Sequence, residues 1–237
     1  MNEGIVEAHR SGILTAATLM ANGNAFDDAV ARARETPSLD VGCHVVLVQG
    51  RSVLDPSRAL PATVTDLVRS LMRRELPVYD EIAAQVRKLV GAGIHPSHID
   101  THKHTHLLPQ VLDAVARISS EFRIPWIRRL VPAPVPFLQQ IGQARLIRRG
   151  CRTTDYFEGF EMTGRFQAAD LASLIRRLPE GATEFMCHPG FCGEELRAAH
   201  TRLKASRQVE LEALTSGEVR RALEESSVTL VRYRDLR

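Results

Sequence analysis

The stretch VGCHVVLV, residues 41–48, is a short run made almost entirely of apolar and β-branched residues. Such a run is typical of a strand that is buried on both faces of a parallel sheet. On either side of it, strand-like runs and helical patterns alternate along the chain. This alternation predicts an α/β fold with a mostly parallel sheet, either open or closed into a barrel.

The other elements are predicted from apolar periodicity, capping residues and Gly or Pro stop signals. Further strands are expected at 13–20, 97–104, 124–130, 153–157, 182–188 and 228–233. Helices are expected at 2–11, 25–36, 63–74, 78–92, 109–122, 136–148, 167–178, 194–214 and 216–225. No linker, repeat or low-complexity segment interrupts this pattern. We therefore expect one domain that spans residues 1–237.

The composition is that of an ordinary soluble globular protein. Of 237 residues, 44% are hydrophobic and 25% are charged, and the net charge is +3. The arginines are scattered and aromatic residues are few, so no nucleic-acid partner is expected. No apolar run reaches the length of a membrane span, and the first residues do not form a secretion signal. The cysteines lack paired spacing, which favours free thiols and a cytoplasmic location; they are Cys43, Cys151, Cys187 and Cys192.

A second informative stretch is HIDTHKHTHLLP, residues 98–109. If the strand persists, alternation places its acidic and imidazole groups on one face and Lys103 on the other. The groups on the first face are Asp100, His102, His104 and His106. Neutral imidazoles bind Zn, Co, Ni or Fe, and an aspartate can fix the imidazole tautomer or ligate the metal itself. The spacing indicates a metal site but names neither metal nor reaction, and hydrogen-bonded surface histidines are the alternative.

Two more histidines stand at the ends of apolar runs. His44 interrupts the strand at 41–48, where a buried polar group needs a partner or a metal. A hydrogen-bonded core histidine is an equally good interpretation of His44. His188 precedes Pro189-Gly190 at a strand-to-loop junction, where a side chain can face a cleft. The remaining histidines are predicted to be surface residues: His9, His95, His98 and His200.

Several stretches, taken together, resemble the YdjC-like carbohydrate deacetylases over nearly the whole chain. They are NEGIVEAHRSGILTAATLMANG (2–23), LDVGCHVVLVQGR (39–51), the histidine string, EFMCHPGF (184–191) and RLKASRQVELEAL (202–214). One branch of that family, the hopanoid-associated deacetylases, has a similar His-Lys-His string. The resemblance implies an imperfect seven-stranded (β/α) barrel related to polysaccharide deacetylases. It also implies a divalent metal (Mg or Zn), removal of N-acetyl groups from amino sugars such as chitooligosaccharides, and a homodimer.

The resemblance assigns roles to particular residues. His44 and His102 correspond to two metal ligands of the family. His188 corresponds to the group that protonates the leaving amine or stabilises the transition state. Arg128 corresponds to an arginine that faces the pocket and contacts the sugar or the developing charge. The residues expected to orient the ligands are Asp100, His104 and His106.

One family motif has no counterpart in the sequence. An Asp-Asp-Phe-Gly strand, which supplies the third ligand and the catalytic base, would lie just upstream of the residues that match 2–5. Asp27-Asp28 follows Phe26 but lies in a helical pattern. We therefore expect a missing first strand, through a truncated start or a degenerate homologue.

The physical cost of that loss is direct. Two histidines bind a divalent ion less tightly than two histidines and a carboxylate, and general-base help contributes about 10²–10⁴-fold to rate. The chain is thus expected to deacetylate slowly or not at all. The alternative is an inactive homologue that binds sugar or metal. A multinuclear phosphoesterase is a lesser alternative, because the scattered ligands it needs are not found.

Overall fold

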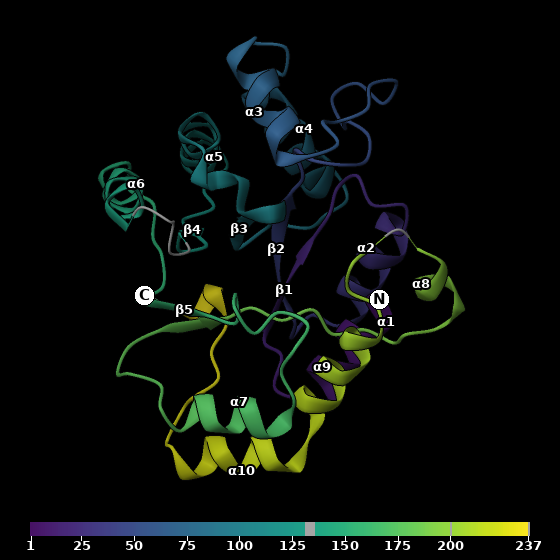
Figure 1. Ribbon diagram of the computed structural model, residues 1–237, viewed down its shortest axis with the longest axis vertical. Helices are drawn as coiled ribbons and strands as arrows, with labels where there is room; N and C mark the ends of the chain where they lie inside the picture. The colour runs from purple at the N-terminus through teal and green to yellow at the C-terminus, as the bar shows by residue number, and fades with distance from the viewer. Residues whose placement is uncertain (131–135, 200, 237) are drawn as a thin grey trace. The chain divides into compact units, whose positions relative to one another are not determined.

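The computed structural model describes residues 1–130, 136–199 and 201–236 (Figure 1). It confirms the predicted α/β class. The chain forms two compact units, and each is described by itself. Unit 1 combines residues 1–17, 31–40 and 155–237, and unit 2 combines residues 18–30 and 41–154.

A four-stranded sheet lies at the centre of unit 2. Its strand order is β1 (Ala16–Leu19), β2 (Asp40–Val45), β3 (His98–Thr101) and β4 (Trp126–Ile127). Strands β2 and β3 are parallel, as are β3 and β4. The register pairs His44 with Asp100. Strands predicted at 13–20, 41–48, 97–104 and 124–130 are therefore confirmed, although each is shorter than predicted.

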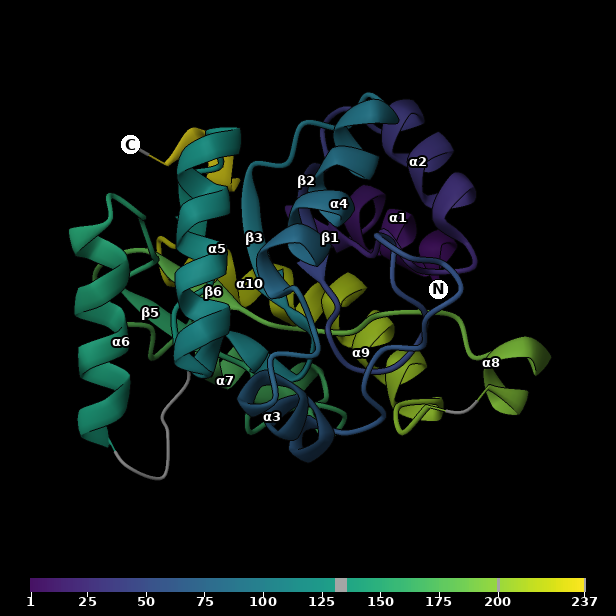
Figure 2. The same cartoon turned by 90° about the horizontal axis from the view of Figure 1, so that it is seen from above.

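Four helices of unit 2 bury apolar faces around this sheet. They are α3 (Val64–Met72), α4 (Val78–Gly91), α5 (Pro109–Phe122) and α6 (Pro136–Arg148). Helix α3 begins after Thr63, whose side chain accepts the backbone N–H of Asp66, and α5 begins with Pro109. Helix α5 packs against both α4 and α6 (Figure 2). Fully buried side chains such as Leu67, Ile82 and Ile118 fill the core between these elements.

Unit 1 is mainly helical. It contains α1 (Asn2–Arg10), α7 (Ala168–Ile175), α8 (Glu194–Ala198), α9 (Ala205–Thr215) and α10 (Gly217–Glu225). Helices α7 and α10 lie side by side (Figure 1), and α1 packs against α9. Their core includes Ala8, Phe166, Leu171, Leu214 and Val219. The first turn of α1 lies against a distant segment, since a Cβ on Gly4 would come 2.6 Å from the Cα of Gly190. Helix α2 (Phe26–Glu35) is divided between the two units.

The strands of unit 1 form a separate sheet. Strands β5 (Tyr156–Glu158) and β6 (Thr183–Phe185) pair in parallel. They correspond to the strands predicted at 153–157 and 182–188. The described ranges thus hold six strands in two sheets. A seven-stranded barrel with an absent first strand stays a prediction.

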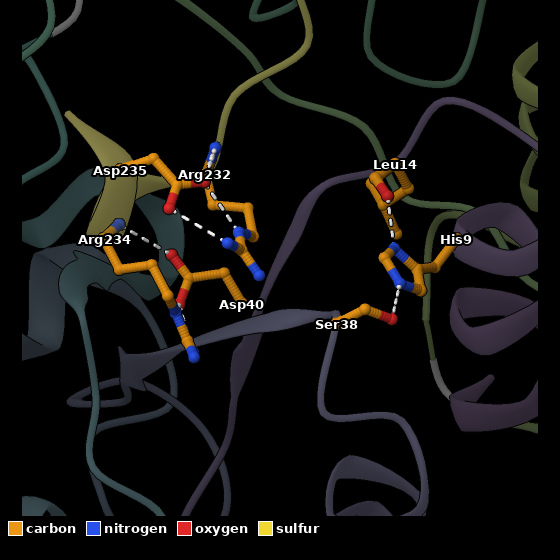
Figure 3. A network of polar contacts seen from close by, with 7 residues as sticks. All are labelled: His9, Leu14, Ser38, Asp40, Arg232, Arg234 and Asp235. Carbon is orange, nitrogen blue, oxygen red and sulfur yellow. Dashed lines mark hydrogen bonds and ion pairs between the residues drawn. The ribbon is translucent and has the colours of Figure 1, made fainter.

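The predicted strand at 228–233 is wrong. The chain has no regular structure there until a 3-10 turn, η2 (Tyr233–Asp235). Arg232 Nε pairs with Asp235 at 2.7 Å, and Arg234 Nε pairs with the buried carboxylate of Asp40 at 2.7 Å (Figure 3). The backbone N–H of Arg234 also donates to Asp40, at 3.1 Å. These side-chain contacts hold a tight turn where β-branched residues alone suggested a strand.

The single helix predicted at 194–214 is also wrong, because α8 ends at Ala198 and α9 starts only at Ala205. Between them Leu203 packs against Gly164, where a Cβ would lie 2.7 Å from the leucine side chain. Tertiary packing therefore overrides a favourable helical sequence. Helix α1, predicted at 2–11, is observed at Asn2–Arg10, with Met1 at its N-cap position.

Two predictions about the chain as a whole can be compared with the structure. All four cysteines are free thiols, as expected. Within the described ranges, none of the helices has the length and apolar character needed to cross a membrane.

Candidate metal and proton-transfer site

The strand that carries the histidine string ends earlier than the alternating pattern predicts. A 3-10 helix, η1 (His102–Leu107), follows Thr101, and Lys103 and His104 inside it have left-handed φ angles of 54° and 52°. The Thr101 hydroxyl accepts the backbone N–H of His106 at 3.0 Å and bonds its Nδ1 at 2.6 Å. The prediction that side chains keep alternating between two faces of a strand is therefore wrong beyond His102, because the turn breaks the two-residue alternation.

The parallel register brings His44 and Asp100 together on neighbouring strands. His44 Nδ1 lies 2.8 Å from Asp100 Oδ1, and the other carboxylate oxygen pairs with Arg128 Nη1 at 2.5 Å. A carboxylate only accepts hydrogen bonds, so Nδ1 of His44 carries the proton and a neutral His44 has its lone pair on Nε2. Asp100 is 2% exposed and Arg128 9% exposed, so this ion pair is buried.

The second ring nitrogen of His44, Nε2, points toward His102. His44 Nε2 and His102 Nδ1 are 3.3 Å apart, and the ring planes are at 75° to each other. Two imidazole nitrogens bound at about 2.0–2.1 Å to one tetrahedral metal ion lie roughly 3.3–3.4 Å apart. Without an ion, the same separation suits a hydrogen bond between the rings. The pair therefore has the spacing of two ligands of one metal.

Electrostatics keep these groups in the protonation states that ligation needs. Burial alone would raise the pKa of the Asp100 carboxyl, but Arg128 and then His44 hold it well below its usual range. Burial, with the neighbouring His44, lowers the pKa of His102 to about 4. At neutral pH, Asp100 is thus an anion and His102 a neutral imidazole, which is the form that binds metals.

The last two histidines of the string lie deeper. Burial lowers the pKa of His104 to about 4 and that of His106 to about 3. Their rings are 5.9 Å apart, and His106 is fully buried. Since its Nδ1 and its backbone N–H both engage Thr101, His106 holds the turn that presents His102.

The buried, neutral state of His106 predicts a pH-dependent stability. With a pKa of about 3 when folded and about 6.5 when unfolded, His106 binds protons preferentially in the unfolded chain below about pH 6.5. Its contribution to the free energy of unfolding is complete above that pH and is lost as pH falls. We expect a loss of about 2 kcal/mol between about pH 7 and pH 5 from this residue. Urea titrations of the wild type and His106→Gln at both pH values test this, since the variant lacks that part of the pH dependence. An equal pH dependence in both proteins would contradict it.

The buried pair of Asp100 and Arg128 predicts a large effect on stability. Asp100→Asn places an amide N–H₂ or a neutral oxygen against the guanidinium, and we expect a loss of about 3–5 kcal/mol of unfolding free energy. Adding Arg128→Met to that variant removes the buried charge and should recover much of the loss. Denaturant titrations of the two variants measure both effects. A single variant that unfolds like the wild type would contradict the assignment.

The remaining predicted residue, His188, belongs to unit 1, just after β6. Its backbone N–H donates to Glu210 at 2.5 Å, and its Nδ1 lies 4.0 Å from the same carboxylate oxygen. Its side chain is 29% exposed. His44, Asp100, His102 and Arg128 are thus brought together within unit 2, and the approach of His188 to them stays a prediction.

Three buried polar residues were not predicted as buried from the sequence. His98 was predicted at the surface but is 3% exposed on β3, and Gly42 makes room for it, since a Cβ there would lie 2.6 Å from the imidazole ring. Glu81 is fully buried on α4 and accepts the backbone N–H of Val53 in the loop after β2, at 2.9 Å. Glu210, on α9, is 1% exposed.

The burial of the two glutamates could have been predicted from their positions on the apolar faces of predicted helices. Glu81 is four residues before buried Gln85, and Glu210 four residues before buried Leu214. A carboxylate on the apolar face of a helix needs a buried partner. Of the other predicted surface histidines, His95 is exposed, His9 is partly buried between Leu14 and Ser38 (Figure 3), and His200 lies outside the described residues.

The described part of the chain holds no group of three or more His, Cys, Asp or Glu side chains arranged to hold a metal ion. The two-histidine pair is therefore a partial ligand set by itself. Asp100 does not add to it as a ligand here, because one oxygen bonds His44 and the other bonds Arg128.

Comparisons with known proteins show which family the chain resembles. A family model described as YdjC-like protein matches residues 1–225. The carbohydrate deacetylase of Brevibacillus brevis is 33% identical over all of this chain and 94% of its own length. That of Clostridium beijerinckii is 29% identical over the same shares. A crystal structure from Enterococcus faecalis V583, described as a candidate cellobiose-phosphate cleavage protein, has a TM-score of 0.80 at 24% identity and covers 98% of this chain and 92% of that one; it shows the fold alone. On the family match over nearly its whole length, the chain belongs to the YdjC-like protein family.

Proposed function

We propose that this protein is a metal-dependent carbohydrate deacetylase that removes N-acetyl groups from amino sugars. The observation that carries the proposal is the 3.3 Å spacing between His44 Nε2 and His102 Nδ1, with Asp100 fixing the tautomer of His44. The two relatives named carbohydrate deacetylase support the substrate class. An N-acetylated chitooligosaccharide or a glycolipid sugar would fit that class.

The residues present fit a divalent ion as two ligands of a larger set. His102 is neutral at pH 7, and Asp100 binds Nδ1 of His44, which leaves the lone pair on Nε2, as imidazole ligands require. A Zn or Mg ion bound there would polarise the acetyl carbonyl and acidify a water molecule. Imidazole ligands favour Zn over Mg.

The protein's own groups would supply the proton transfers. We assign His188 to give a proton to the amine that leaves when the amide bond breaks. Arg128 is engaged with Asp100 at 2.5 Å, and we assign it first to keeping that carboxylate charged. A contact between Arg128 and sugar hydroxyls is a further part of the proposal.

A catalytically impaired sugar- or metal-binding protein is the second candidate. It is favoured because, in the residues that the structure describes, no third His, Cys, Asp or Glu is arranged with the two histidines to hold a metal ion. Such a protein would bind N-acetylated sugar without releasing acetate.

Acetate release separates the two candidates. The chain is stripped of metal, reloaded with Zn²⁺ or Mg²⁺, and incubated with chitobiose and longer N-acetylglucosamine oligomers. A deacetylase releases acetate only after metal is added. Calorimetric sugar binding without acetate release would support the binding protein, and the absence of both would reject the proposed substrate class.

A further inference from the structure

The segment that carries His188, residues 187–192, has no regular secondary structure and is held by side chains and backbone of α9. The backbone N–H of His188 donates to Glu210 Oε2 at 2.5 Å, and its carbonyl accepts from Arg207 Nη1 at 3.3 Å. Two residues on, the N–H of Gly190 donates to the carbonyl of Arg207 at 3.1 Å. The loop that presents His188 thus forms both backbone and side-chain hydrogen bonds with α9.

Glu210 is an unusual residue for its place. It is 1% exposed and lies beside Leu211 and Leu214 on the buried face of α9. Its second oxygen accepts the backbone N–H of Gly164 at 2.8 Å, so both carboxylate oxygens receive backbone hydrogen bonds. Burial raises the pKa of Glu210, while the two backbone N–H groups and Arg207 oppose that shift. An apolar side chain here would leave the N–H groups of His188 and Gly164 without this acceptor, so the carboxylate holds the His188 segment against α9.

We infer that Glu210 is a positioning residue for His188: it fixes the backbone that presents the imidazole and places a negative charge beside the ring. The separation between His188 Nδ1 and Glu210 Oε2 is 4.0 Å. An opposite charge at that distance favours the protonated ring, which is the form that gives a proton to a leaving amine. This inference rests on the proposed function, because it names a residue for that reaction. It gives a role to the RLKASRQVELEAL stretch.

Among the described residues of unit 1, two charged side chains of α9 contact the His188 segment, and they are Glu210 and Arg207. The Arg207 guanidinium opposes protonation of the ring, whereas Glu210 favours it. Removing the charge of Glu210 should therefore lower the pKa of His188.

Nuclear magnetic resonance titration of the His188 ring tests the inference without any enzyme assay. In Glu210→Gln we expect the pKa of His188 to fall by about one unit or more, while Glu210→Asp keeps it close to the wild type. The matched control is Glu212→Gln, on the exposed side of the same helix, which should leave the pKa unchanged. An unchanged His188 pKa in Glu210→Gln would overturn the inference.

Amide hydrogen exchange in the wild type covers the case in which Glu210→Gln fails to fold. The N–H of His188 should exchange at least about 100-fold more slowly than an exposed loop amide, because a buried carboxylate accepts it. Exchange at the rate of an exposed amide would overturn the inference.

Kinetics link the residue to the reaction. In Glu210→Gln, kcat should fall about 10-fold, and KM should stay within about twofold of the wild type. The fall in activity on the alkaline side of the pH profile should begin at a lower pH than in the wild type. Glu210→Asp should restore part of the lost kcat. If the wild type releases no acetate while the His188 pKa still shifts, the proposed function fails and the positioning contact stands. If the wild type is active and neither kcat nor the His188 pKa responds to Glu210→Gln, the positioning role fails and the proposed function stands.

Discussion

Replacing His102 with alanine is expected to reduce metal-dependent acetate release to background. His102 Nδ1 lies 3.3 Å from His44 Nε2, which is the spacing of two ligands of one metal ion. Whole four-ligand zinc sites supply about 10–16 kcal/mol, so one ligand is worth roughly 10²–10³-fold in affinity or more. His44→Ala should have an effect of the same size, because the two imidazole nitrogens would bind the same metal ion.

The measurement is a zinc titration by competition with a chromogenic chelator, alongside the acetate assay. His95→Ala is the matched control, since His95 is an exposed histidine of the same unit. It should leave both affinity and activity unchanged. Zinc binding by His102→Ala at wild-type affinity would show that the metal is held elsewhere.

Replacing His188 with alanine should lower turnover by about 10²–10⁴-fold while metal content stays near that of the wild type. His188 is assigned to donating a proton and not to binding the metal, so turnover should fall while metal content does not. KM should change little, because the imidazole acts mainly as the amide bond breaks.

Free imidazole in the assay offers a control for His188→Ala. If the variant lacks only the proton donor, added imidazole should restore part of kcat. Its thermal unfolding midpoint should remain close to that of the wild type, since the side chain of His188 is 29% exposed. Loss of metal in parallel with activity would instead make His188 a ligand.

Parallel strands and their order along the chain could be predicted, because buried strands are continuous apolar runs. The contact between His44 and Asp100 is a consequence of that arrangement, since the register of two neighbouring parallel strands places them opposite each other. The end of β3 could not be predicted from alternation. It depends on the Thr101 hydroxyl, whose bonds to His106 turn the chain where propensity alone would continue the strand.

The C-terminal segment shows the same limit. VTLVRY has the composition of a strand, yet the Arg234 contact with buried Asp40 decides its conformation. That partner is 194 residues away in the sequence. Local sequence patterns carry no information on such a contact. The buried glutamates on α4 and α9, by contrast, interrupt apolar helical faces, so their burial could have been predicted from the sequence.

The packing of α1 on α9 bears on how the protein emerges from the ribosome. The first turn of α1 rests on Gly190 and the helix packs on α9, so unit 1 joins segments that lie far apart in the sequence. At a synthesis rate of about 5–20 residues per second, α1 waits on the order of 10–40 s for its partner to be made. During that interval, the continuous stretch at 41–154 that makes up most of unit 2 can fold first. Until α9 is made, Val6 and Ala8 of α1, which are buried in the folded unit, remain exposed to water and to non-native apolar contacts.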